Sequence, residues 1–309
     1  DGHATSHVKA DRSKMPVPGE TPALDFPTVE TGKLKNGIKV HFARRNAVPA
    51  VRIAVSFDAG YAADPLDKRG VSNIMGNLLS EGTLTLNATQ LAETEERLGA
   101  DINVASSQDR TVASLRAVKP NLAASIGLLA DVVKNPAFAE KDLERVRVQQ
   151  LTRIAGEKNQ PQGLALRALP ELIYGKAHPY GGPQTGTGDE AAVRTLTRAD
   201  VASFHQSWIH PAKAEIFVVG DTSLKEITKL LNKQFGNWKP KATAAPAKNF
   251  AVAMPEAKAR IVLIDRPNSP QSYILGGKVL DAKGSDDLLP LRSANEIFGG
   301  DFTSRINMD

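Results

Sequence analysis

Alternation of apolar and polar residues marks two pairs of strands in the first part of the chain. GIKVHFARR (37–45) and AVRIAVSFDAG (50–60) lie on either side of a short turn. Their period of two is typical of half-buried strands, and we expect the two runs to pair antiparallel. ADINVASSQDRTVASLRAV (100–118) alternates across a polar turn at Gln108 and Asp109, which predicts a second antiparallel pair.

Helical spacing accounts for most of the remaining residues before position 238. GVSNIMGNLLSEGT (70–83) is amphipathic, and NATQLAETEERLG (87–99) has an Asn cap, apolar spacing and a closing Gly. Further helices are predicted over NLAASIGLLADVVKN, EKDLERVRVQQLTRIAGEKN, a segment beginning near Arg198, and SLKEITKLLNKQFGNW, which follows a strand, AEIFVVGD (214–221). This order predicts an α+β fold, in which an antiparallel sheet is packed by helices on one face.

The opening pattern returns after KPKATAAPAKN (239–249), which has the composition of a linker. RIVLIDRPNSPQSYILGGKV and DDLLPLRSANEIFGGDFT repeat the order strand, turn, strand and helix, about 220 residues downstream. We therefore expect a polar, extended N-terminal arm (1–30), a first α+β domain (31–238), the linker, and the N-terminal part of a second, duplicated domain (250–309). Because a half domain would leave an open sheet edge and an unsealed core, we expect the natural protein to be longer than this chain.

Composition then narrows the possible functions. The net charge is +5, but the 39 Lys and Arg residues are dispersed among 34 Asp and Glu residues. Because they form no basic patch along the chain, we expect no nucleic-acid partner. No apolar run approaches the roughly 20 residues that span a bilayer, so no membrane span is expected. The absence of cysteine excludes disulfides, thiolate nucleophiles and Cys-ligated zinc.

From about residue 33 to the end, the chain resembles the insulinase/pitrilysin family of zinc peptidases, most closely its short bacterial and mitochondrial-processing-peptidase-like branch. The segments that carry the resemblance follow one another in the same order along the chain. They are NGIKV (36–40), GVSNIMGNLLSEGT, LGADINVASSQDRTV (98–112), HPYGGPQTGTGDE (178–190), LTRADVASFHQSWIHP (196–211), IFVVGD (216–221) and FGGDFTSRINMD (298–309).

The resemblance implies an inverted zinc motif, H-x-x-E-H, on the helix at 70–83, and a distant glutamate as the third protein ligand. Residues i and i+4 of a helix share one face, so two imidazoles there can reach one Zn²⁺ beside a general base at i+3. In this chain the motif positions hold Asn73, Gly76 and Asn77, and the distant position holds Arg153. A carboxamide is a poor zinc ligand, glycine supplies no base, and a guanidinium repels the metal. We therefore expect no metal and no catalytic residue in this chain.

The histidines do not restore a metal site. The spacing of His3 and His7 would allow weak surface binding or ordinary solvated side chains. The others do not pair with another histidine or a carboxylate at helical ligand spacing, so structural roles are expected for them. They are His41, His178, His205 and His210.

Two further segments are candidates for contact with peptide. In the family, an extended substrate adds a strand to a sheet edge, and the matching edge here is Asn103-Val104-Ala105-Ser106-Ser107. A plain solvated edge strand is the alternative. Gly299 and Gly300, with Asp301, resemble the glycine-rich loop of non-catalytic processing-peptidase subunits, and a helix cap followed by a bend is the alternative there.

These features lead to one main functional hypothesis. We expect a non-catalytic subunit of a heterodimeric zinc endopeptidase, inactive alone, that closes the chamber and helps to hold an extended peptide, while a homologous H-x-x-E-H subunit carries the zinc. The alternatives are a scaffold protein of the same fold, like the core subunits of respiratory complexes, and part of a longer metallopeptidase whose active site lies elsewhere. The bacterial resemblance suggests the periplasm, with the cytoplasm as the alternative.

Overall fold

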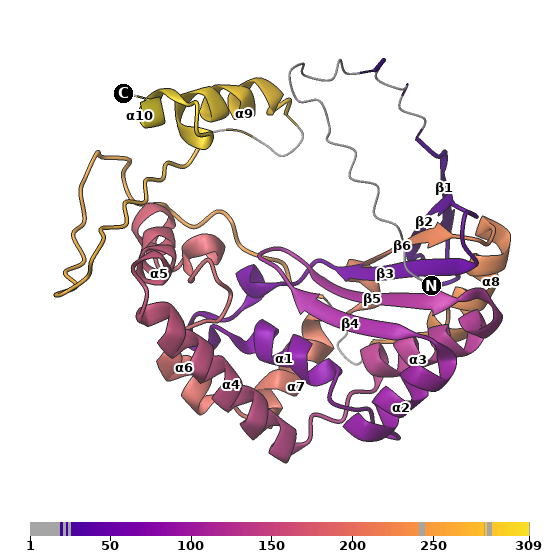
Figure 1. Ribbon diagram of the computed structural model, residues 1–309. Coiled ribbons are helices and arrows are strands. Elements are labelled where there is room, and N and C mark those ends of the chain that lie inside the picture. Colours follow the sequence, from indigo (N-terminus) through magenta and orange to yellow (C-terminus); the bar gives the residue numbers. More distant parts are fainter. Residues whose placement is uncertain are drawn as a thin grey trace, which may run out of the picture.

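A sheet of six strands forms one layer of the protein, and helices cover one of its faces (Figure 1). The computed structural model describes residues 19–20, 23, 26–240, 245–280, 282 and 286–308. We call residues 26–240 the first region and residues 245–308 the second region. The strands of the sheet are β1 (Val29–Lys33), β2 (Lys39–Arg44), β3 (Ala50–Phe57), β4 (Asp101–Ser106), β5 (Thr111–Val118) and β6 (Ala214–Gly220).

The order of the strands, β1-β2-β6-β3-β5-β4, differs from the expected one. The last strand, β6, lies between β2 and β3, pairing parallel with β2 (Val40 opposite Ile216) and antiparallel with β3 (Ile53 opposite Val218). The prediction that residues 37–45 and 50–60 pair directly is therefore wrong, and the sheet is mixed rather than antiparallel. Period-two alternation determines which face of a strand is buried but does not identify its neighbour.

Most predicted helices are present, and two were not foreseen. The helices of the first region are α1 (Val71–Leu79), α2 (Ala88–Leu98), α3 (Leu122–Lys134), α4 (Glu140–Lys158), α5 (Pro161–Tyr174), α6 (Glu190–Thr195), α7 (Arg198–Trp208) and α8 (Leu224–Phe235). The unforeseen helices are α5 and α6. Pro161 is the first residue of α5, a position where the missing N–H of proline costs nothing.

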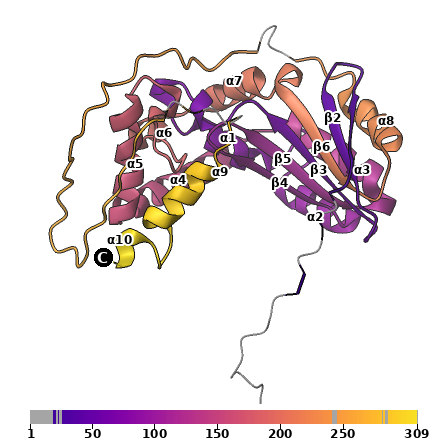
Figure 2. The same ribbon diagram turned by 90° about the horizontal axis from the view of Figure 1, so that it is seen from above.

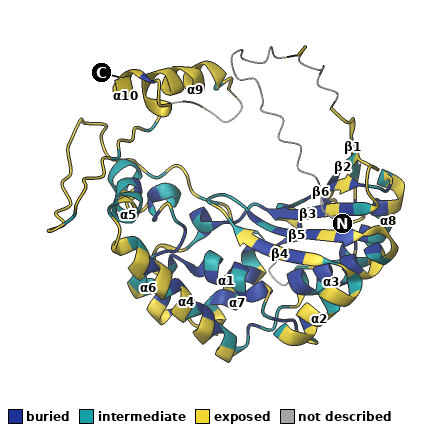
Figure 3. Cartoon of the chain, viewed as in Figure 1, coloured by how far each residue is buried: buried dark blue, intermediate teal, exposed yellow. Residues whose placement is uncertain are grey.

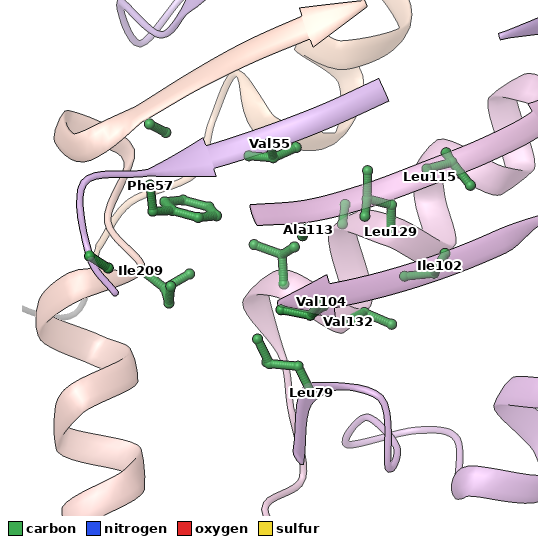
Figure 4. Close-up of a cluster of buried hydrophobic side chains, with 14 of the residues drawn as sticks. Val55, Phe57, Leu79, Ile102, Val104, Ala113, Leu115, Leu129, Val132 and Ile209 are labelled. Atoms are coloured by element: carbon green, nitrogen blue, oxygen red, sulfur yellow. The ribbon is translucent and has the colours of Figure 1, made fainter. Parts of the chain in front are cut away.

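The hydrophobic core lies between the covered face of the sheet and the helices. Figure 4 shows Val55, Phe57 and Val104 from the strands packed near Leu79 and Leu129 from the helices. The same division is visible in Figure 3, where the strands and the inner sides of α1, α3 and α7 carry the buried residues. Burying this apolar surface is the main contribution to the stability of the first region.

The second region has a different character. It contains the helix α9 (Leu289–Asn295), a π-helical turn (Glu296–Gly300) and the short α10 (Arg305–Met308). None of its described residues forms a strand, although 260–279 repeats the pattern of β2 and β3. In Figure 2 this part of the chain runs along the outside beside α5. A strand needs a neighbouring ladder for its backbone groups, and no described strand offers one here, so the two expected strands are absent.

The boundaries at both ends of the first region also differ from expectation. β1 begins at Val29, within the expected arm of residues 1–30, most of which lies outside the described residues together with His3 and His7. At the other end, Lys248 of the expected linker is 4% exposed. The linker therefore includes a residue that packs against the first region.

Candidate functional site

The helix α1 is held at its start by a carboxylate from the preceding turn. Asp64 accepts hydrogen bonds from the backbone N–H of Gly70 (2.6 Å) and of Ser72 (3.1 Å). Burial raises the pKa of Asp64 to about 7, although these hydrogen bonds favour its charged form. Gly70 has φ 107°, and a Cβ there would lie 2.8 Å from a side-chain carbon of Val193, so only glycine fits. These contacts fix the direction in which α1 presents its polar face.

The structure brings together the two asparagines and the arginine predicted to replace zinc ligands. The Nδ2 of Asn77 donates to the carbonyl oxygen of Asn73 (2.8 Å) and to its Oδ1 (3.0 Å), as expected for residues one turn apart. Arg153 comes from α4, which packs on α1, and its Nη2 lies 3.4 Å from the same Oδ1. Three side chains from two helices thus form one polar cluster.

Gly76 lies on α1 beside this cluster and faces the end of β4. A Cβ added to Gly76 would be 3.3 Å from the Oγ of Ser106. That hydroxyl donates to the carbonyl oxygen of Ser72 (3.1 Å), which joins β4 to α1. Gly76 is buried, so the missing side chain lets α1 pack closely against the end of β4.

The donors of this cluster do not fit zinc. The Oδ1 of Asn73 is shared by an amide N–H and a guanidinium, and Gly76 adds no side chain. A divalent cation placed there would face the permanent charge of Arg153 with no carboxylate or imidazole to balance it. Within the described part of the chain, no three His, Cys, Asp or Glu side chains are grouped so that they could hold a metal ion.

The predicted peptide-binding strand lies at the edge of the sheet. β4 is the last strand in the order, and none of the described strands pairs with its outer side. Ile102 and Val104 are buried, whereas Asn103 and Ala105 are exposed (Figure 3). Ser107 lies beyond the strand, where its carbonyl oxygen accepts the N–H of Tyr61 (3.0 Å). The edge strand is therefore Asp101–Ser106, in which the N–H of Ile102 donates to Glu95 (3.1 Å), and Ser107 of the predicted range lies beyond it.

The predicted glycine loop is helical and lies elsewhere. Gly299 and Gly300 belong to the π-helical turn after α9, and Asp301 follows in an extended conformation. This is closer to the alternative of a helix end followed by a bend. Figure 1 shows this turn well apart from α1 and α4, so the structure does not bring the two glycines to the polar cluster.

The histidines of the described residues have structural surroundings. The Nδ1 of His178 accepts the N–H of Tyr180 (3.0 Å), and burial lowers the pKa of its imidazole. The Nε2 of His205 lies 2.8 Å from the carbonyl oxygen of Val133, and His41 stacks on Phe217. His210 caps a short turn by accepting the N–H of Ala212 (3.1 Å).

Sequence reasoning missed a cluster around Lys248. Its Nζ lies 2.8 Å from the Oδ1 of Asp58 and 2.7 Å from the carbonyl oxygen of Asp109. Burial alone would raise the pKa of Asp58, but the hydrogen bonds and charges of Lys248 and Lys213 lower it overall. The ring of Phe250 packs 5.1 Å from that of Tyr180. No local signal reveals this contact, because Lys248 and Asp58 are 190 positions apart.

No helix among the described residues has both the length and the apolar content needed to cross a bilayer.

Comparison with protein families gives two matches along the chain. Residues 39–184 match the model described as insulinase (peptidase family M16). Residues 195–308 match the model described as the peptidase M16 inactive domain. The two matches cover most of both regions.

Individual relatives agree with these matches. The chain is 27% identical over 220 residues to a probable mitochondrial-processing peptidase subunit beta from Schizosaccharomyces pombe, covering 70% of this chain and 47% of that protein. It is 22% identical over 275 residues to the uncharacterized zinc protease YmxG from Bacillus subtilis, covering 89% of this chain and 65% of the relative. The chain thus spans about half to two thirds of the length of these relatives.

Solved structures share the fold. A peptidase M16 inactive domain from Pseudomonas fluorescens superposes with a TM-score of 0.67 at 28% identity, over 72% of this chain and 53% of that one. The periplasmic protease PqqL from Escherichia coli gives a TM-score of 0.63 at 20% identity, over 74% of this chain and 26% of that one, a likeness of fold alone.

Proposed function

Because the chain belongs to the insulinase family (peptidase family M16) and is similar to a mitochondrial-processing peptidase subunit, we propose that it acts as a non-catalytic subunit of a heterodimeric zinc endopeptidase. A homologous subunit with an intact H-x-x-E-H motif would supply the zinc and the general base. This chain would close the chamber on the other side and help to hold the peptide.

The observation that carries the proposal is the cluster of Asn73, Asn77 and Arg153 beside Gly76. Every position at which the family pattern needs a zinc ligand or base holds a residue that cannot perform that role. The Nη2 of Arg153 lies 3.4 Å from the Oδ1 of Asn73, so a positive charge lies beside a position where the family pattern needs a zinc ligand. An enzyme that encloses its substrate between two subunits needs only one catalytic centre, so this loss is compatible with peptidase activity of the pair.

The edge of β4 supports the proposed peptide contact. An extended peptide would add as a further strand, with its backbone hydrogen bonded to β4 and its side chains alternating between the two faces. Such pairing depends little on sequence, which suits a subunit that holds varied peptides. For the location of the chain we propose the periplasm, on the resemblance to bacterial members of the family.

The proposal is tested by zinc analysis and reconstitution. We expect the purified chain to contain no stoichiometric zinc and to cleave no unstructured peptide. Mixing it with a homologous H-x-x-E-H protein from the same genome should produce cleavage that neither protein shows alone. Zinc and turnover by this chain alone would refute the proposal. A stable but inactive pair would favour the scaffold function instead.

A restored ligand set provides the matched control. The variant N73H/G76E/N77H/R153E places two imidazoles and two carboxylates on α1 and α4, and we expect it to bind about one zinc ion per chain. In this variant the Cβ at position 76 would lie 3.3 Å from the Oγ of Ser106, so that hydroxyl must move slightly. Zinc in this variant but not in the natural chain would show that these four positions form the replaced site.

A further inference from the structure

The polar cluster between α1 and α4 contains an arginine without an ionic partner. Arg153 is exposed, and its Nη2 lies 3.4 Å from the neutral Oδ1 of Asn73, farther than the 2.7–2.9 Å of a charge-assisted hydrogen bond. The other two arginines of α4 are paired, Arg145 with Glu81 and Arg147 with Glu144. Among the described residues, Arg153 forms no salt bridge.

The acidic residues around Arg153 are occupied by other groups. Glu157, one turn further along α4, lies 2.6 Å from the Nη1 of Arg167 and also accepts the hydroxyl of Thr187 (2.8 Å). On the side of α1, Glu81 is bonded to Arg145. The positive charge of Arg153 therefore remains uncompensated next to the site.

The edge strand β4 and the helix that carries Arg153 contact the same neighbour, α1. α1 touches both β4 and α4, so one helix joins the open edge to the arginine (Figure 1). Gly76 is buried where α1 packs on the end of β4, and Asn73, the neighbour of Arg153, lies three residues earlier on the same helix. A guanidinium has a planar fork of N–H donors that matches the two oxygens of a carboxylate.

We propose that Arg153 binds a carboxylate of the peptide that adds to β4, so that this subunit selects acidic peptide segments or free peptide C-termini. The inference rests on the proposed peptide contact of β4, but not on the pairing with a catalytic subunit.

The test measures binding of fluorescent peptides to the full chain by anisotropy at low ionic strength. Four versions of one extended peptide are compared: with a central Glu or Gln, and with a free or amidated C-terminus. We expect about tenfold tighter binding for the versions that carry the recognised carboxylate, and the two arms distinguish a side-chain carboxylate from a terminal one. Arg153→Gln should remove the preference, and Arg153→Lys should retain part of it.

Arg145→Gln is the matched control, because it removes the same charge from the same helix at a residue paired with Glu81. It should leave the preference for the carboxylate unchanged. Equal affinity of the natural chain for all four peptides, or equal losses in both variants, would overturn the inference. Reconstituted peptidase activity would be unaffected by that failure, which separates it from failure of the proposed function.

Discussion

In the first region Val40 and Ile53 are 0% and 1% exposed, and both lie in strands. In the second region Ile261 and Leu263 lie in a continuous apolar run (261–264) that also suggests a strand, but they are 99% and 88% exposed, and neither lies in a strand. Local patterns are therefore not sufficient to form a strand. Neighbouring strands must supply the backbone partners, and helices must cover the apolar face.

The largest expected effect comes from one apolar truncation in each region. Phe57→Ala should lower the free energy of unfolding by about 3–5 kcal/mol, because Phe57 is 1% exposed and packs among both layers. Ile261→Ala should change it by less than about 0.5 kcal/mol. Urea titration followed by circular dichroism measures both. Similar losses in the two variants would show that the second region is packed as tightly as the first.

The contact of Lys248 with the first region gives the next effect. Lys248→Met removes the charge-assisted bonds to Asp58 and Asp109, so we expect a loss of about 2 kcal/mol and faster proteolysis after residue 248. Lys258→Met is the control, because Lys258 and its partner Glu256 are 73% and 75% exposed at their side chains. Unchanged proteolysis of the Lys248 variant would mean that this contact does not hold the two regions together.

The smallest effect concerns an ion pair at the surface of the first region. The hydrogen bond from Lys68, with those from Thr197, lowers the pKa of Asp200 to about 2 from the usual 3.8. A lowered pKa stabilises the folded state above pH 4, and this contribution is lost as the pH falls from about 4 to about 2. Asp200→Asn should therefore cost about 1 kcal/mol at pH 7 and progressively less toward pH 2.

Thermal unfolding at several pH values measures this difference. Glu256→Gln serves as the control, since that carboxylate is 75% exposed. A cost for Asp200→Asn that stays constant from pH 7 to pH 2 would contradict the assignment of the effect to the charge of Asp200.

Much of the local structure could be predicted from the residues alone. The Asn87 cap and the closing Gly99 delimit α2 in the structure, because capping depends on groups within one turn. The spacing of Asn73 and Asn77 was sufficient to place their side chains on one face of α1. Only the family resemblance indicated that Arg153 would lie near these two asparagines.

The contacts between distant segments could not be predicted from local patterns. β6 inserts between β2 and β3, and Lys248 packs against Asp58, yet neither position carries a local signal for its neighbour. α5 was missed for another reason. It begins at Pro161 and contains Pro170, and proline disfavours a helix except in the first turn, where Pro161 lies.

The sequence by itself determined the chemistry at positions 73, 76, 77 and 153, because the ability of a side chain to bind zinc or accept a proton belongs to its functional group. It also determined most helices of the first region, since helical bonds and caps are local. Only the tertiary structure decided the strand order, the burial of Lys248 and the exposure of Ile261. These depend on which distant segments meet, and their free energy comes from surfaces that exist only in the folded protein.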